Sequence, residues 1–393
     1  MRSPSHRLVT CAAVLWLAAA LLACEEPPAG STTGSDGSTS QDSGADAAQE
    51  AAADARLGGP DATPEVPVDA GEQVSDGGIA VADAAMPAAD TGSVTTPFAG
   101  QCEAAFPGTP TGTWRHPTAS AIVVGQGGPN HRARDLVVSP GEQVSVRAHF
   151  TYGVMDKDLQ DEDVEVWLRR CPDWMKLATL TTDTDGVVMA AMPADLPKGE
   201  YRLRFLVMGD GASTDGVLAV WPAGTQAIVT DIDGTLTTSD WQAVQDVVGL
   251  GEADMYPDAN AVMLQWAAKG YRLLYLTGRP QVVSRYTREW VEARGFPPGP
   301  VQLNDDLGTF WPLESNVQEF KAGRLTEIAG KGVFWRVAYG NATTDIGAYA
   351  ETGIPKADTF IIGEHAGEEG TVAVSSYAEH LPVAAAYPDA VQP

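Results

Sequence analysis

The sequence predicts two folded domains in series: an all-β sandwich, then an α/β domain of Rossmann-like type with a mostly parallel sheet and helices on both faces. Three observations support this fold class. In residues 106–222, short runs of alternating apolar and polar side chains are separated by turn residues. From residue 223 onward, apolar strands alternate with amphipathic helices. The first of those strands runs directly into a pair of aspartates.

The predicted sandwich, residues 106–222, is of immunoglobulin-like type, because several short strands follow one another with regular turns. Pro-Gly and Asp-Gly pairs supply turn signals between the runs. The clearest alternation lies at 144–150, 164–169 and 201–207. Shorter apolar runs lie at 136–138, 177–180, 187–190 and 217–221.

One acidic run in the sandwich, Asp156–Asp163, begins with the Asp-x-Asp-x-Gln spacing of a calcium loop. It lacks the glycine at the sixth position and the glutamate at the twelfth that such loops need. The sequence therefore favours a solvated acidic connection between two strands and leaves cation binding there open.

The predicted α/β domain covers residues 223–393. Its strands are expected at 227–230, 271–276, 301–303, 333–339 and, as the last one, 359–362. Its helices are expected at 257–269, 280–294, 317–329 and 344–351. Strict alternation of these elements indicates parallel strands joined by helical crossovers.

The chain begins with a short basic segment that contains Arg2 and Arg7, followed by an apolar run at 8–22. This run is shorter than the roughly 20 residues that a spanning helix needs. It ends in Leu21-Leu22-Ala23-Cys24, which resembles the signal of bacterial lipoproteins. The resemblance implies removal of residues 1–23, lipid attachment at Cys24 and an exported protein anchored in the cell envelope. Glu25 favours the outer membrane over the inner one. The alternative is an ordinary secretory signal with an incidental cysteine.

Residues 24–105 are expected to form a disordered tether rich in Ala, Gly, Ser and Asp. Within it, residues 25–100 hold 14 acids and one base, so much of the net charge of −27 belongs to the tether. Residues 101–393 still carry −16. Such an acidic chain is a poor candidate for nucleic-acid binding, because phosphate contacts need basic residues.

The chain has four cysteines, and two of them are not expected to be free to form a disulfide in the mature protein. Cys11 lies in the predicted signal and Cys24 would carry lipid. The remaining pair, Cys102 and Cys171, is predicted to form a disulfide in an exported protein. Two free buried thiols are the alternative.

The strand at 227–230 leads into Asp231-Ile232-Asp233-Gly234-Thr235-Leu236. Sites in open parallel sheets form at the carboxyl ends of strands. There one aspartate could attack a phosphorus atom while the other moves a proton to the leaving oxygen. Carboxylates so close together call for a cation, and oxygen ligands suit Mg²⁺.

This Asp-x-Asp-Gly-Thr-Leu segment resembles motif one of the haloacid dehalogenase superfamily of phosphohydrolases. Three further motifs follow in order: Thr277 before Gly278-Arg279, then Lys321, then Asp345. The resemblance implies that Asp231 is the nucleophile, Asp233 the acid and base, and Thr277 and Lys321 the groups that hold phosphate. Asp231, Asp233 and Asp345 would bind Mg²⁺. Arg324 lies one helical turn from Lys321 and is the alternative cation.

A closer resemblance covers residues 225–385 and rests on DIDGTLTTSD, YRLLYLTGR, FPPGP and YGNATTDIGAY. Their order is similar to that of the LNS2 domain. In lipins this domain is a Mg²⁺-dependent phosphatidate phosphatase; in phosphatidylinositol-transfer proteins it binds phosphatidate. The candidate substrate-binding residues are Gly234, Thr235, Gly278, Arg279 and Asn341. Arg288 either helps to hold substrate or lies on a surface helix.

The sequence therefore favours a Mg²⁺-dependent phosphomonoester hydrolase that acts through an aspartyl-phosphate, with phosphatidate as the preferred substrate. About 40 residues separate motif one from motif two, which leaves no room for a large cap over the site. Two alternatives stay open: a non-catalytic module that binds phosphatidate, and a broad-specificity phosphatase of the cell envelope. The charge of −16 on the folded part speaks against an anionic lipid.

Overall fold

The structure, a computed structural model, describes residues 102, 104–238, 254–304 and 314–393. The predicted signal, the lipidated Cys24 and nearly all of the predicted tether lie outside the described residues. In the described part of the chain, no helix combines the length and apolar character that crossing a membrane requires.

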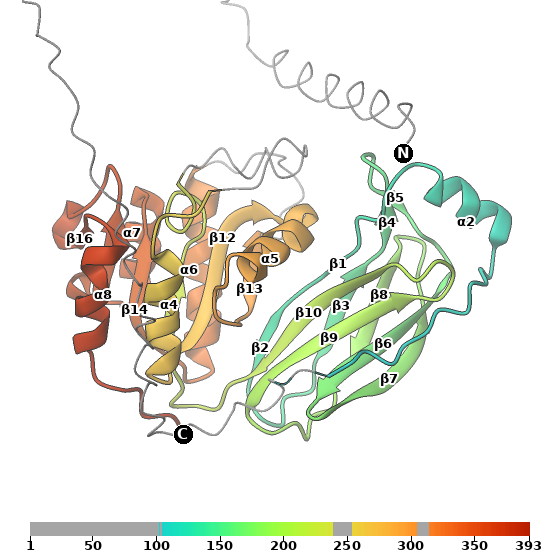
Figure 1. Cartoon of the computed structure of the whole chain (residues 1–393), viewed down its shortest axis with the longest axis horizontal. Helices are drawn as coiled ribbons and strands as arrows, with labels where there is room; N and C mark the ends of the chain where they lie inside the picture. The colour runs from blue at the N-terminus through green and yellow to red at the C-terminus, as the bar shows by residue number, and fades with distance from the viewer. Residues whose placement is uncertain (1–101, 103, 239–253, 305–313) are drawn as a thin grey trace, which may run out of the picture. The chain divides into compact units, whose positions relative to one another are not determined.

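The first domain is a β-sandwich, as predicted (Figure 1). A five-stranded sheet has the order β2 (Leu136–Val138), β10 (Ser213–Val220), β9 (Gly199–Val207), β6 (Asp163–Arg170), β7 (Asp173–Thr181). A three-stranded sheet has the order β1 (Arg132–Ala133), β3 (Ser145–His149), β8 (Val187–Ala191). A short hairpin pairs β4 (Thr151–Tyr152) with β5 (Lys157–Asp158).

Period-two alternation explains the core of the sandwich. On β6, the side chains of Val164, Val166 and Leu168 are fully buried, whereas Glu165 and Trp167 between them are only partly buried. The inward residues of β3, β8 and β9 join the same apolar cluster. Burial of apolar area contributes roughly 25 cal/mol per Å², so these alternating positions stabilise the two-layer arrangement.

The sequence analysis missed a helix, α2 (Pro117–Val124), and misjudged the acidic run before β6. Glu162 is buried and accepts hydrogen bonds from the backbone N–H groups of Arg115 and His116 and from the hydroxyl of Ser120. A carboxylate at this end of a helix satisfies donors that have no intrahelical partner.

Asp156 and Asp158 in the same run also bind protein groups. Arg132 donates to both oxygens of Asp156, at 2.9 and 2.5 Å, and His149 Nε2 lies 2.7 Å from Asp158 Oδ1. The prediction of a solvated connection is therefore correct only in part: Lys157, Gln160 and Asp161 are exposed, whereas protein groups bind the carboxylates of Asp156, Asp158 and Glu162.

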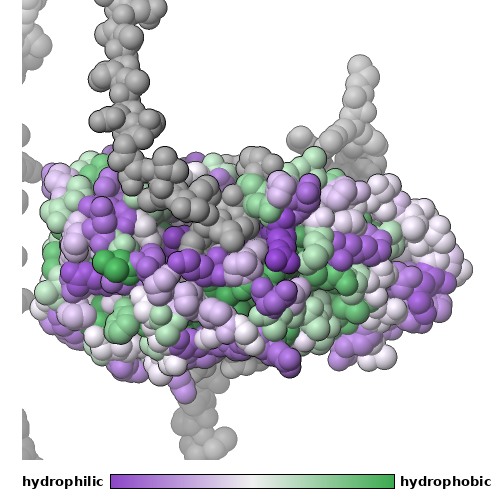
Figure 2. Space-filling model, turned by 90° about the horizontal axis from the view of Figure 1, so that it is seen from below, coloured by the Kyte–Doolittle hydropathy of each residue, from purple (hydrophilic) through white to green (hydrophobic). Residues whose placement is uncertain are grey.

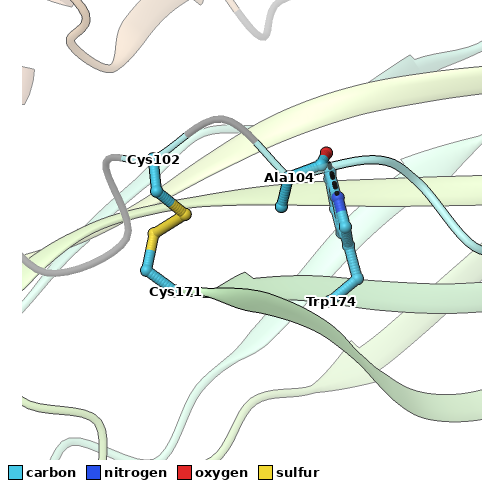
Figure 3. The surroundings of a disulfide bond; sticks show 4 residues. All are labelled: Cys102, Ala104, Cys171 and Trp174. Atoms are coloured by element: carbon cyan, nitrogen blue, oxygen red, sulfur yellow. Dashed lines mark hydrogen bonds between the residues drawn. A yellow bond between two sulfur atoms is a disulfide. The ribbon is translucent and has the colours of Figure 1, made fainter.

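Cys102 and Cys171 form a disulfide, the pairing that the sequence predicts (Figure 3). Their Cα atoms are 5.9 Å apart, and the sequence separation is 69. Beside the bond, the indole nitrogen of Trp174 donates to the carbonyl oxygen of Ala104 at 3.1 Å. The two links fix the segment that precedes the sandwich against β7.

The second domain contains a six-stranded sheet in which neighbouring strands are paired in parallel. Its order is β13 (Val301–Asn304), β12 (Arg272–Pro280), β11 (Gln226–Thr230), β14 (Phe334–Gly340), β15 (Thr359–Ile362), β16 (Val372–Val374). The first strand, β11, lies at the centre. Successive strands are added on one side and then on the other, which makes a topological switch point beside β11.

Helices cover both faces of this sheet (Figure 1). The helices are α4 (Ala259–Ala268), α5 (Ser284–Ala293), α6 (Glu314–Gly330), α7 (Thr343–Glu351) and α8 (Tyr377–Ala386). Three-residue turns of 3₁₀ helix are η1 (Gln281–Val283), η2 (Lys356–Asp358) and η3 (Glu368–Gly370). Ile228 packs in the cluster with α4, α5 and α8, whereas its neighbour Val229 packs with α6 and α7. Neighbouring strand residues point to opposite faces, so the two groups of helices lie on opposite sides.

The predicted fold class is confirmed, with one correction at the carboxyl end of the chain. The strand at 359–362 is not the last, because β16 and α8 follow it. The hydroxyl of Ser376 accepts a hydrogen bond from the N–H of Glu379 and begins α8. Pro382 within this helix and the shortness of β16 obscured both elements in the sequence.

Large hydrophobic side chains are also exposed at several places, among them Val154 and Met155 in the turn between β4 and β5. On the face drawn in Figure 2, hydrophobic residues lie interspersed with hydrophilic ones. Apolar side chains scattered in this way are normal on folded proteins and need no functional explanation.

Candidate active site

The predicted site residues meet at the carboxyl ends of β11, β12 and β14. Asp231 directly follows β11, and its N–H donates to the carbonyl oxygen of Tyr339 on β14 at 2.9 Å. Thr277 and Arg279 lie near the carboxyl end of β12, which extends to Pro280, four residues beyond the predicted end. A register shift between Leu276 and Pro280 marks the point where β12 leaves regular pairing.

After Asp231 the chain turns sharply. Gly234 has φ +69°, a conformation that suits glycine because it lacks a Cβ atom. Its N–H donates to the Thr237 hydroxyl at 3.0 Å, and the N–H of Leu236 returns to Ile232 O at 2.8 Å. The turn brings Asp233 back over the ends of the strands.

Lys321 joins two of the acids. Its Nζ lies 2.7 Å from Asp231 Oδ1 and 2.6 Å from Asp345 Oδ1. All three side chains are at least 96% buried. Burial tends to lower the pKa of Lys321, but the two carboxylates together raise it above its ordinary value. Lys321 is therefore a fixed positive charge in the site.

Burial raises the pKa of Asp231 above the usual range for aspartate. Lys321 opposes this shift, and repulsion from Asp345 and Asp233 adds to it. One ammonium thus serves two buried carboxylates, and a further cation would stabilise their ionised forms.

Asp345 lies at the start of α7, where its Oδ2 accepts the N–H groups of Asn341 and Ala342, both at 3.1 Å. Gly340 is essential to this approach. A Cβ atom at Gly340 would lie 2.5 Å from the Cβ of Asp345, closer than real side chains approach. The glycine at the end of β14 therefore lets the acid lie against the strand.

Asp233 is bound by two residues of β12. The Thr277 hydroxyl donates to its Oδ2 at 2.8 Å. Arg279 donates through Nη2 to Oδ1 at 2.8 Å and through Nε at 3.0 Å to both oxygens. The Nη1 of Arg279 donates to the hydroxyl of Thr287 on α5 at 3.1 Å. This bidentate geometry is stronger and more directional than a single ion pair.

Thr235 links the first and last motifs. Its hydroxyl lies 3.0 Å from Asp231 Oδ2 and 3.2 Å from Asn341 Oδ1. Its carbonyl oxygen accepts the hydroxyl of Tyr377 on α8 at 2.8 Å. Thr235 is fully buried, so these contacts are made away from solvent.

The structure thus brings together Asp231, Asp233, Thr235, Thr277, Arg279, Lys321, Asn341 and Asp345. Gly278 lies against α6: a Cβ atom at this position would lie 3.1 Å from the side chain of Val317. Arg324 lies apart from these acids, because its Nη1 donates to Glu327 at 2.8 Å on the exposed side of α6. Of the two candidate cations, Lys321 is therefore the one that contacts Asp231.

Sequence reasoning assigned no role to Gly340, Thr287 and Tyr377, which touch the site residues, although Gly340 lies within the YGNATTDIGAY segment. A glycine directly after the apolar run of β14 was a signal available for Gly340. Arg288 was interpreted as a substrate contact or a surface residue. Both interpretations are wrong, because Arg288 is buried and binds Asp135 of the sandwich at 2.7 and 2.8 Å.

The donor chemistry of the site fits a hard cation. Asp231 and Asp345 offer carboxylate oxygens, and their combined charge exceeds that of Lys321. Among the residues that the structure describes, no group of three His, Cys, Asp or Glu side chains is arranged to hold a metal. The carboxylate of Asp233 binds Thr277 and Arg279 instead, so of the three acids Asp231 and Asp345 are the ones whose side chains remain for a cation.

Comparisons with known proteins support both domains. Residues 228–363 match the family model described as the LNS2 domain of PITM 1-3, and residues 129–220 match the beta-sandwich domain of the same proteins. Protein retinal degeneration B of Drosophila melanogaster is 32% identical over 262 residues, 64% of this chain and 20% of that protein. Human membrane-associated phosphatidylinositol transfer protein 1 is 31% identical over 249 residues, 60% of this chain and 18% of that protein.

The chain thus spans about a fifth of the length of these curated relatives. Among solved structures, a D,D-heptose 1.7-bisphosphate phosphatase from B. bronchiseptica is similar at 13% identity and a TM-score of 0.30, over 41% of this chain and 96% of that one. On its sequence matches and its sheet topology, the chain contains a β-sandwich domain followed by an LNS2 domain, which belongs to the haloacid dehalogenase-like superfamily.

Proposed function

We propose that the chain is a Mg²⁺-dependent phosphomonoester hydrolase that acts through an aspartyl-phosphate on Asp231, with phosphatidate as the preferred substrate. One observation carries the proposal. Asp231 and Asp345 are buried around the single ammonium of Lys321, with Asp233 two residues away on the same turn. Three acids gathered at one edge of the sheet would repel an anionic ligand unless a cation accompanied it.

In the proposed first step, a carboxylate oxygen of Asp231 attacks phosphorus in line and the bond to the leaving oxygen breaks. Lys321 neutralises charge on the nucleophile and on the phosphoryl oxygens, and the Thr235 hydroxyl orients the other oxygen of Asp231. Most catalysis of phosphoryl transfer comes from such positioning and electrostatic stabilisation.

Asp233 is proposed to give a proton to the departing alkoxide and then to take one from the water that hydrolyses the aspartyl-phosphate. In the structure, Arg279 and Thr277 hold its carboxylate. An incoming phosphate group offers these two donors a second anion, which allows Asp233 to carry the proton. Gly234, Gly278 and Asn341 line the same turns and complete the proposed phosphate site.

Asp231, Asp345 and the main-chain carbonyl of Asp233 would hold Mg²⁺. When bound, the ion would supply positive charge for the nucleophile and the transferring phosphoryl group. Lys321 binds Oδ1 of each carboxylate, and Thr235 and two backbone N–H groups bind the Oδ2 atoms, so the ion would share these oxygens with protein donors.

A lipid substrate is favoured by the relatives, which are named as phosphatidylinositol transfer proteins. We further propose that Cys24 is lipidated and that residues 24–105 tether the domains to the cell envelope, at the outer membrane rather than the inner. An anchored enzyme meets membrane phospholipids at high effective concentration.

The second candidate is a binding module for phosphatidate or related phospholipids. The hydrogen bonds from Arg279 to Asp233 favour it, because a paired carboxylate is not ready to donate a proton. In such a module Arg279 and Lys321 would bind phosphate, and Asp231 would be dispensable. A broad-specificity phosphatase of the cell envelope is the third candidate.

The deciding experiment measures phosphate release with Mg²⁺ from phosphatidate in mixed micelles and from soluble phosphomonoesters. Wild-type protein is expected to hydrolyse phosphatidate best, and Asp231→Asn to be inactive. Asp195→Asn, at an exposed position of the sandwich, is the matched control. Preference for soluble substrates would support the broad phosphatase. If nothing is hydrolysed, and if Asp231→Asn still binds phosphatidate vesicles as wild type does, the binding module is correct.

A further inference from the structure

Helix α5 contacts the β-sandwich along one face. Arg285, Arg288 and Glu292 are spaced by three and four residues, so they lie on the same side of the helix. Arg285 Nη1 donates to the carbonyl oxygen of Pro129 at 3.3 Å. Arg202 of β9 donates through Nη2 to both oxygens of Glu292, at 2.7 and 2.9 Å. The two domains lie within one compact unit, and α5 joins them.

Asp135 is the most completely bonded group in this contact. Its carboxylate is fully buried and accepts Nη1 and Nη2 of Arg288, at 2.8 and 2.7 Å. It also accepts the backbone N–H of Val217 in the sandwich and that of Val301 at the start of β13, both at 2.7 Å. A buried carboxylate with this many charged and backbone donors fixes its partners with little freedom.

The residue beside Arg288 belongs to the catalytic side of the helix. The Thr287 hydroxyl is fully buried, donates to Val283 O at 3.0 Å and accepts Nη1 of Arg279 at 3.1 Å. Arg279 in turn binds both oxygens of Asp233. A continuous set of hydrogen bonds and one peptide link therefore leads from the sandwich to the acid–base carboxylate.

We propose that Asp135 of the sandwich is a positioning residue for catalysis: it holds α5 so that Thr287 and Arg279 keep Asp233 in place. The inference rests on the proposed function and deepens it, because it gives the sandwich a part in the reaction. Asp135 touches no reacting atom and acts through Arg288 and Thr287.

The first test uses variants at the interface. Arg288→Lys is expected to fold, because it keeps a positive charge beside Asp135. It loses the bidentate contact with the two carboxylate oxygens. Hydrolysis of the aspartyl-phosphate, followed in a single turnover, is expected to slow about tenfold, the cost of one charged hydrogen bond. Substrate binding has no part in that step. Glu142→Gln, which weakens a domain-bridging pair away from α5, with Lys331 at 2.7 Å, is the control and is expected to change the rate less than about twofold.

The second test breaks the connection inside the α/β domain. Thr287→Val removes the acceptor for Arg279 and is expected to slow the same step about tenfold. Thr287→Ser restores the hydroxyl and is expected to recover the wild-type rate. Valine and serine that give equal rates would overturn the proposal, because a structural role alone would not depend on the hydroxyl.

A readout independent of activity separates this inference from the proposed function. Amide hydrogen exchange at 279–288 is expected to rise about tenfold in Arg288→Lys and to stay unchanged in Glu142→Gln. If wild type hydrolyses nothing but the exchange follows this pattern, the proposed function fails and the link between sandwich and α5 stands. Unchanged exchange in Arg288→Lys overturns the inference whatever the activity.

Discussion

Two nitrogens of Arg279 bind the carboxylate of Asp233: Nη2 lies 2.8 Å from Oδ1, and Nε lies 3.0 Å from both oxygens. The side chain of Arg279 is 2% exposed and that of Asp233 is 21% exposed, so the pair is partly shielded from water. Arg279 therefore fixes the orientation of the Asp233 carboxylate, and the hydrogen bond to the Thr287 hydroxyl limits the movement of the Arg279 side chain.

Arg279→Lys is expected to lower kcat/KM for phosphate release by about 10- to 100-fold, because an ammonium cannot reproduce the two-nitrogen contact with Asp233. Steady-state phosphate release in Mg²⁺ measures the loss. Arg324→Lys is the control, because Arg324 pairs with Glu327 on α6 and does not contact Asp233. A rate equal to wild type in Arg279→Lys would remove Arg279 from the proposed mechanism.

Gly340→Ala is expected to displace Asp345, since the new methyl group would lie 2.5 Å from its Cβ and 2.9 Å from its Oδ2. We expect the Mg²⁺ concentration for half-maximal activity to rise by about tenfold or more, in line with the effect of disturbing the surroundings of a ligand. Gly323→Ala on α6 meets no atom within 4 Å and is the control. An unchanged Mg²⁺ dependence in Gly340→Ala would show that Asp345 holds no metal.

The sequence predicted the position of a site residue correctly where that residue follows a strand of the parallel sheet. Asp231 follows a buried apolar strand, and Asp345 begins a helix after another, so the parallel sheet alone places both at one edge. It was silent where partners come from far along the chain. Arg288 and Asp135 are 153 residues apart, and nothing local to either marks them as a pair. Glu162 likewise looked solvated, because helix α2 was missed, and Glu162 accepts the backbone N–H groups of the two residues just before that helix.

Removing the disulfide by Cys102→Ala with Cys171→Ala is expected to lower the free energy of unfolding by about 2–4 kcal/mol. The bond closes a loop of 69 residues, and a cross-link across a long loop removes more entropy from the unfolded chain than one across a short loop. Urea unfolding of both proteins, with and without reductant, measures the difference. Reductant should destabilise wild type to the level of the variant and leave the variant unchanged. A wild type insensitive to complete reduction would contradict the prediction.

Acid is expected to destabilise the sandwich through His131. Its ring is fully buried between Phe150 and Tyr152, and burial lowers its pKa to about 3. Its Nδ1 accepts the N–H of Thr151, a bond that protonation there would abolish. As the pH falls through 6.5, His131 takes up a proton in the unfolded chain, whereas in the folded chain it stays neutral until about pH 3. Stability from this group is therefore complete above pH 6.5 and falls as the pH drops toward 3, by about 1.4 kcal/mol per unit.

His131→Asn offers an oxygen at the place of Nδ1 but cannot titrate. The variant is expected to be less stable than wild type at pH 7, because it leaves space between Phe150 and Tyr152. Its stability should fall less steeply between pH 6 and about 4, the range in which only wild type loses this contribution. Urea melts at matched pH values give the two slopes, and the contributions of other acidic and histidine groups cancel in their difference. Equal slopes would mean that His131 does not stay neutral in the folded sandwich.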